Sequence, residues 1–148
     1  MPLCTKEVKF LIVDDDQISV MAMQRTMRKL KIVNETHVCT DGQHALDFLR
    51  EEAKKVSGLP PYIVTLDLNM PRMGGLEFLA ELRRDPELSN MVIFVFTTSD
   101  IPKDVQEAYH HNVAGYVVKE NPTETFAAAL DMLDSYARIV ELPGSIRM

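Results

Sequence analysis

Several charged or hydroxyl-bearing residues stand at or just after the ends of apolar runs, where neutral turn residues would be ordinary. They are Asp14, Asp15, Asp16, Asp67, Thr97 and Lys119. Carboxylates bind hard cations, while a hydroxyl and an ammonium group stabilise the oxygens of a phosphoryl group. If folding brings these residues together, they form a site for a cation and a phosphoryl group.

The apolar runs predict the elements that carry these residues. Five short runs, apolar through much of their length, indicate buried strands. They cover residues 9–13, 35–40, 62–68, 91–96 and 114–119. Apolar residues at three- and four-residue spacing indicate five helices. These follow residues 16, 42, 75, 101 and 121, and the last continues to about Val140.

The alternation of strands and helices predicts βα units, which pair their strands in parallel. We therefore predict an α/β fold, a doubly wound five-stranded parallel sheet flanked by five helices, of the flavodoxin-like type. With the strand order 2-1-3-4-5, the first and third strands flank the switch point, where ligands bind beyond the carboxyl ends. Asp14, Asp15 and Asp67 then converge on one pocket, and Thr97 and Lys119 lie on its far wall.

Three carboxylates in one pocket repel one another, at a cost of about 3 kcal/mol for each pair ~5 Å apart. A cation is needed to hold them together, and hard oxygen ligands select Mg²⁺ or Mn²⁺. A carboxylate beside such an ion can act as a nucleophile and form an aspartyl phosphate. Asp16 directly precedes the first helix, so we expect it to cap that helix and not to bind the metal.

The order of these residues along the chain resembles that of a receiver domain of two-component response regulators, from about Lys6 to Val140. The segment DLNMPRMGG (67–75) is similar to the family's phosphoacceptor segment, an aspartate followed by a Met-Pro step and a glycine-containing turn. We therefore expect a single receiver domain over residues 1–140 and a tail over 141–148.

The resemblance implies a role for each residue of the site. Asp67 is the phosphoacceptor, Asp14 and Asp15 are the acidic pair of the metal site, and Asn69 contributes its main-chain carbonyl to the metal. Three further residues match the switch hydroxyl, the switch aromatic and the lysine that pairs with the phosphoryl group. They are Thr97, Tyr116 and Lys119.

The chain departs from the family pattern at two positions. Thr98 stands where the family often has alanine, which alters access to the acyl phosphate. Glu120 follows Lys119 where the family usually has proline, and a cis Lys119–Glu120 bond would be costly. The alternative for Tyr116 is a structural role, because an aromatic residue in a strand is usually part of the core.

The favoured function is a stand-alone response regulator that accepts a phosphoryl group from a sensor histidine kinase or a histidine phosphotransfer protein. It would be a signalling domain rather than an enzyme, with output through protein contacts or relay. The alternative is a small phosphohydrolase that forms an aspartyl phosphate. Such an enzyme usually has a second acid two residues after its nucleophile, and Asn69 at that position cannot donate the proton. A flavin-binding module of the same fold lacks an evident phosphate-binding loop.

Bulk properties limit the partners. The formal charge of -6, with no basic cluster, argues against nucleic acid or an anionic membrane surface. No apolar stretch approaches the roughly 20 residues of a membrane helix. Two cysteines, Cys4 and Cys39, without a leader segment are typical of a cytoplasmic protein.

Several segments are similar to the stand-alone regulators that partner bacterial phytochromes. They are the loop at 57–61, DLNMP, TTSD and the VELPG tail. This similarity implies a bacteriophytochrome as the kinase and a homodimer formed through the C-terminal helix and tail. The apolar residues of that helix could serve the core or this interface. They are Phe126, Leu130, Leu133, Tyr136, Ile139 and Val140.

Overall fold

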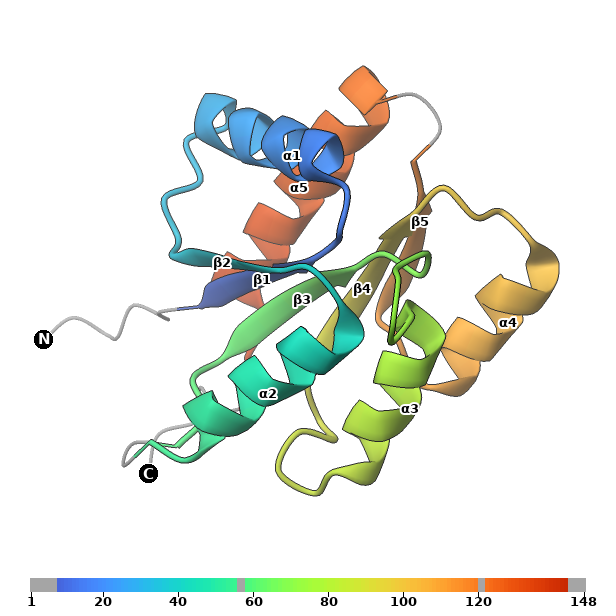
Figure 1. The fold of residues 1–148 in the computed structure, drawn as a ribbon. Helices are drawn as coiled ribbons and strands as arrows, with labels where there is room; N and C mark the ends of the chain where they lie inside the picture. Colours follow the sequence, from blue (N-terminus) through green and yellow to red (C-terminus); the bar gives the residue numbers. More distant parts are fainter. Residues whose placement is uncertain (1–7, 56–57, 120–121, 144–148) are drawn as a thin grey trace, which may run out of the picture.

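The computed structural model describes residues 8–55, 58–119 and 122–143, in which five strands alternate with five helices (Figure 1). The strands are β1 (Lys9–Val13), β2 (Thr36–Cys39), β3 (Tyr62–Leu66), β4 (Val92–Thr97) and β5 (Gly115–Val118). The helices are α1 (Gln17–Lys29), α2 (Gly42–Ala53), α3 (Gly75–Arg84), α4 (Pro102–His110) and α5 (Pro122–Ile139).

All strand pairs are parallel, and the sheet order is β2-β1-β3-β4-β5. The predicted doubly wound, flavodoxin-like fold is therefore confirmed. Val13 at the end of β1 pairs with Cys39 on one side and Leu66 on the other. The carboxyl ends of these strands thus lie at one edge of the sheet.

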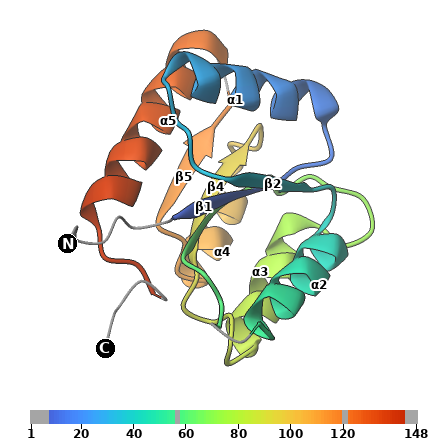
Figure 2. The same ribbon diagram turned by 90° about the vertical axis from the view of Figure 1, so that its left-hand side faces the viewer.

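Helices cover both faces of the sheet. Helices α1 and α5 lie on one face, and α2, α3 and α4 lie on the other (Figures 1 and 2). Alternate strand residues divide between the two cores, because successive side chains of a strand point to opposite faces. Phe10 and Ile12 pack with α1 and α5, whereas Leu11 and Val13 pack with the other three helices.

Strand β3 ends earlier than the apolar run predicts, at Leu66 instead of Leu68. The chain turns back at once, since the Gly75 amide donates to the Leu68 carbonyl at 3.1 Å. A Cβ atom at Gly75 would lie 2.6 Å from the Asp67 carbonyl oxygen, so only glycine fits this close approach. The early turn leaves the Asp67 side chain at the edge of the sheet.

The prediction that Asp16 caps α1 is confirmed, because its carboxylate accepts from the Ile18 amide at 3.0 Å. Cys39 is buried and free, and burial raises the pKa of its thiol to about 12. In the described parts of the chain, no helix is long and apolar enough to span a bilayer. Cys4, the isomer of the Lys119–Glu120 bond and the tail from residue 144 lie outside the described residues.

Candidate functional site

Three carboxylates meet at the carboxyl edge of the sheet. Asp14 and Asp15 follow β1, Asp67 follows the adjacent β3, and one oxygen from each lies within 4.8 Å of the others. Asp14 and Asp67 are 3% and 8% exposed, whereas Asp15 is exposed to solvent. The strand order brings these side chains together from positions more than fifty residues apart, as the sequence predicts.

Lys119 lies directly after β5 and extends across the edge of the sheet to this cluster. Its Nζ is 3.0 Å from Asp14 Oδ2 and 3.7 Å from Asp67 Oδ2, and its side chain is 9% exposed. It also lies 3.0 Å from the Ser19 hydroxyl oxygen on α1. One ammonium group therefore pairs with both buried carboxylates, and it lies nearer to Asp14 than to Asp67.

Asp67 accepts two hydrogen bonds on one carboxylate oxygen. The Thr97 hydroxyl, fully buried at the end of β4, donates to Asp67 Oδ1 at 2.8 Å. The Asn69 amide donates to the same oxygen at 3.1 Å. The second oxygen, Oδ2, faces Lys119. The Asp67 carboxylate is thus held in one orientation, with one oxygen turned toward the cation.

Tyr116 lies on β5, partly buried against the core of the α2–α4 face. Its hydroxyl donates to the Ser99 carbonyl at 2.8 Å, two residues beyond Thr97. The Ser99 hydroxyl in turn donates to Asp104 on α4 at 2.6 Å. A chain of contacts therefore joins the end of β4, the strand β5 and the start of α4. Thr98, between Thr97 and Ser99, is exposed.

The carboxylates have different electrostatic surroundings. Burial raises the pKa of Asp14, although the Asp16 amide and the Lys119 ammonium act in the opposite direction. The nearby charge of Asp67 adds to the rise in the pKa. The surroundings of Asp14 therefore disfavour its ionised form, and a further cation nearby would stabilise that form.

The donor set fits a hard divalent cation. Three carboxylate oxygens within 4.8 Å of one another can share one ion, and Mg²⁺ and Mn²⁺ prefer such ligands. Lys119 provides a single positive charge against three negative ones. A divalent ion would balance the remaining charge, so the residues present fit the expected metal.

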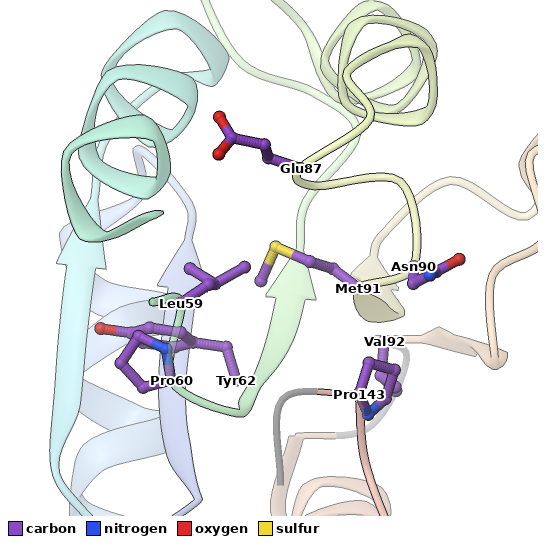
Figure 3. Close-up of a pocket in the computed structure, with 8 residues that line it drawn as sticks. All are labelled: Leu59, Pro60, Tyr62, Glu87, Asn90, Met91, Val92 and Pro143. Atoms are coloured by element: carbon purple, nitrogen blue, oxygen red, sulfur yellow. The ribbon is translucent and has the colours of Figure 1, made fainter. Parts of the chain in front are cut away.

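A cavity of about 230 Å³ lies at the other end of the sheet. Tyr62 and Val92 at the starts of β3 and β4 line it with Leu59, Met91 and four other residues. Figure 3 shows Leu59 pointing toward Met91 across this space. Its lining is part polar and part apolar and includes none of the three clustered carboxylates, so the cavity is separate from the site at the carboxyl edge.

Two contacts of the site were not predicted from the sequence, those of Ser19 and Ser99. Ser19 lies in the first turn of α1, which begins directly after Asp16. Residues in this turn must lie over the edge of the sheet, so the position of Ser19 beside the site could have been predicted from the sequence. The Ser99 contact is made by its backbone carbonyl, so the type of residue at this position gives no indication of it.

Comparison with known proteins agrees with the geometry. Residues 10–131 match the family model described as the response regulator receiver domain. The response regulator Rcp1 of Synechocystis is 28% identical over 136 residues, covering 91% of this chain and 92% of Rcp1. The chemotaxis protein CheY-3 of Vibrio cholerae is 31% identical over 131 residues, covering 88% of this chain and 95% of CheY-3.

Solved structures with similar folds include two response regulators. The Mn²⁺-bound form of Rcp1 matches with a TM-score of 0.77 at 28% identity, covering 91% of this chain and 98% of that chain. The phosphorylated cyanobacterial phytochrome response regulator RcpA matches with a TM-score of 0.79 at 26% identity, covering 91% and 97%. One similar protein thus binds Mn²⁺, and another is phosphorylated.

Proposed function

The chain belongs to the response regulator receiver domain family, and from this premise we propose that it is a phosphoacceptor switch of a two-component pathway. Asp67 is the acceptor. The observation that carries the proposal is the arrangement around this carboxylate: Thr97 at 2.8 Å, Lys119 at 3.7 Å and two further carboxylates beside it. These groups combine a nucleophile with stabilisers for a phosphoryl group.

In the proposed reaction, an Asp67 oxygen attacks the phosphorus of a phosphohistidine on a histidine kinase or a phosphotransfer protein. The phosphorus–nitrogen bond breaks, its electron pair goes to the imidazole, and an acyl phosphate forms on Asp67. Asp14, Asp15, Asp67 and the main-chain carbonyl of Asn69 would hold Mg²⁺ or Mn²⁺. The ion would neutralise phosphoryl oxygens, and Lys119 would pair with another of them.

The conformational response would start at Thr97. Its hydroxyl now donates to the Asp67 carboxylate, and a phosphoryl oxygen on Asp67 offers it a more highly charged acceptor. A shift at Thr97 would reach Tyr116 through Ser99, because the Ser99 carbonyl accepts a hydrogen bond from the Tyr116 hydroxyl. The exposed face around α4 and β5 would therefore change with the state of Asp67.

The proposed partner is a sensor histidine kinase of the bacterial phytochrome type. The similarity of the chain to RcpA, a cyanobacterial phytochrome response regulator, supports this proposal. The chain is similar to a comparable degree, with 31% identity, to the chemotaxis protein CheY-3. Phosphotransfer profiling against purified histidine kinases of the source organism tests the pairing, and transfer from only a non-phytochrome kinase would contradict it.

We also propose a receiver domain over residues 1–140 that dimerises through α5 and the tail. The structure divides the apolar residues of α5, since Phe126, Leu130 and Leu133 are buried in the core and Ile139 is 77% exposed. Ile139 is therefore the better probe of an interface. Light scattering should show a monomer for Ile139→Lys and a dimer for Val33→Lys, a control on the α1–β2 loop. A dimer in both variants would contradict the interface.

The central test is the stoichiometry of phosphorylation by acetyl phosphate with Mg²⁺. We expect one adduct per chain, sensitive to hydroxylamine as an acyl phosphate is, and none in Asp67→Asn. Asp16→Asn is the matched control, because asparagine retains the helix cap and Asp16 lies on the same edge of the sheet. Rapid turnover of varied phosphate esters would instead support the phosphohydrolase.

A further inference from the structure

The loop between β3 and α3 is fastened to the start of α2. This loop carries Asn69, and it runs beside the first turn of α2 (Figure 1). The Gly42 amide donates to the Met73 carbonyl at 3.0 Å, and the Arg72 guanidinium pairs with the Asp41 carboxylate. Two contacts from adjacent residues therefore join the same two segments.

The Asp41 carboxylate is well suited to anchor the loop. It is 1% exposed, it follows β2, and it caps α2 by accepting from the His44 amide at 2.8 Å. The His44 amide and the Arg72 guanidinium lower the pKa of Asp41. Its position is thus set by the strand that it follows and by the helix that it caps.

The contact between α2 and the loop is also close. A Cβ atom at Gly42 would lie 2.7 Å from Met73 Cγ and 2.8 Å from the Met73 carbonyl oxygen. Arg72 adopts a left-handed backbone conformation with φ of 61°, which non-glycine residues rarely adopt. Such a conformation persists where surrounding contacts hold it, and the pair with Asp41 is such a contact for Arg72.

We propose that Arg72 is a positioning residue for the metal site, acting through its ion pair with Asp41. The pair holds the loop so that Asn69 and Asp67 keep their mutual arrangement, in which the Asn69 amide donates to Asp67 Oδ1. Arg72 itself is not a ligand. The inference rests on the proposed function, because it concerns the loop that carries Asn69, one of the proposed ligands of the metal.

Simple electrostatics predicts the opposite sign for the loss of Arg72. Removing its positive charge leaves the Asp41 carboxylate uncompensated at the edge of the sheet that carries the other carboxylates, which would draw a divalent cation more strongly. Loss of positioning weakens cation binding instead. The direction of the change therefore separates a positioning role from a charge effect.

The test measures Mn²⁺ affinity by electron paramagnetic resonance of the free ion. We expect Arg72→Ala to weaken binding about tenfold, in the range typical of groups that support a metal ligand. Arg72→Lys keeps a cation near Asp41 and should restore most of the affinity. Gly42→Ala pushes the loop away without a change in charge, so it should also weaken binding. Arg84→Ala, which removes an exposed ion pair on α3, is the matched control and should bind as wild type.

A second readout is the Mg²⁺ dependence of phosphorylation by acetyl phosphate. Arg72→Ala should need more Mg²⁺ for half-maximal rate, while its rate at saturating Mg²⁺ stays close to that of wild type. Thermal unfolding without divalent cations verifies that each variant is folded. Wild-type or tighter Mn²⁺ binding in Arg72→Ala, or wild-type binding in Gly42→Ala, overturns the inference.

Failure of the proposed function has a different signature. If the wild type binds no Mn²⁺, or if Asp15→Asn binds it as the wild type does, the metal site itself is wrong. If the wild type binds Mn²⁺ and Asp15→Asn does not, the affinities of the Arg72 and Gly42 variants decide the inference alone.

Discussion

The two ends of the sheet bury carboxylates in opposite ways. At the amino end, Glu52 accepts a hydrogen bond of 2.9 Å from the Tyr62 hydroxyl and pairs with Lys55 at 2.5 Å. At the carboxyl end, Asp14 and Asp67 share the ammonium group of one lysine, with Asp15 beside them. Glu52 thus has a cation of its own, and the three aspartates do not.

The pKa values follow this difference. Burial opposes the ionisation of Glu52, but Lys55 and Tyr62, together with the charge of Lys9, outweigh it and lower the pKa. Burial also opposes the ionisation of Asp14, and there the pKa is raised despite Lys119. A buried carboxylate that stabilises the fold has its charge compensated locally. At the carboxyl end this compensation is incomplete, which agrees with the proposal that a cation and a phosphoryl group bind there.

Removal of the Lys119 ammonium group should have the largest effect on stability, and it acts at the carboxyl end of the sheet. Lys119→Met leaves the buried carboxylates of Asp14 and Asp67 without their ammonium partner, and losing one partner of a buried ion pair costs about 3 kcal/mol. We expect the free energy of unfolding to fall by this amount in chemical denaturation without divalent cations. Saturating Mg²⁺ should restore more stability to the variant than it adds to the wild type. Equal effects of Mg²⁺ on the two proteins would show that the carboxylates do not share the ion.

The sequence predicted most of this end of the molecule for an identifiable reason. Strand ends are marked by the residue where an apolar run stops, so Asp14, Asp67 and Lys119 could be placed on one edge once the strand order was predicted. Their functional roles stay predictions. The Arg72–Asp41 pair could not be placed, because it depends on the path of a loop whose turn at Gly75 is set by backbone crowding.

The amino end should be less sensitive, and it should not respond to Mg²⁺. Tyr62→Phe removes the hydrogen bond to Glu52, while Lys55 still pairs with that carboxylate. Loss of a buried hydrogen bond to a charged group costs about 1.5 kcal/mol. Denaturation with and without Mg²⁺ should give the same loss. Tyr109→Phe, half-exposed on α4, is the control and should leave stability unchanged. A loss for Tyr62→Phe that Mg²⁺ reverses would contradict the separation of the two ends.

The smallest effect concerns the pH dependence of stability at Glu52. Its pKa in the folded protein lies below its usual value of about 4.3, because Lys55 and Tyr62 favour the ionised form over the opposing effect of burial. The folded state therefore binds a proton less readily than the unfolded state, so Glu52 contributes stability above about pH 4.3 and loses it as the pH falls through the folded-state pKa.

Glu52→Gln keeps an acceptor for the Tyr62 hydroxyl and removes only the charge, so we expect a loss of about 1 kcal/mol at neutral pH. The difference between wild type and variant in the free energy of unfolding should shrink below about pH 4.3. Measurements without divalent cations keep the carboxyl end out of the comparison. A difference that grows as the pH falls would mean that Glu52 is stabilised by protonation, as Asp14 is, and that its charge is not compensated by Lys55.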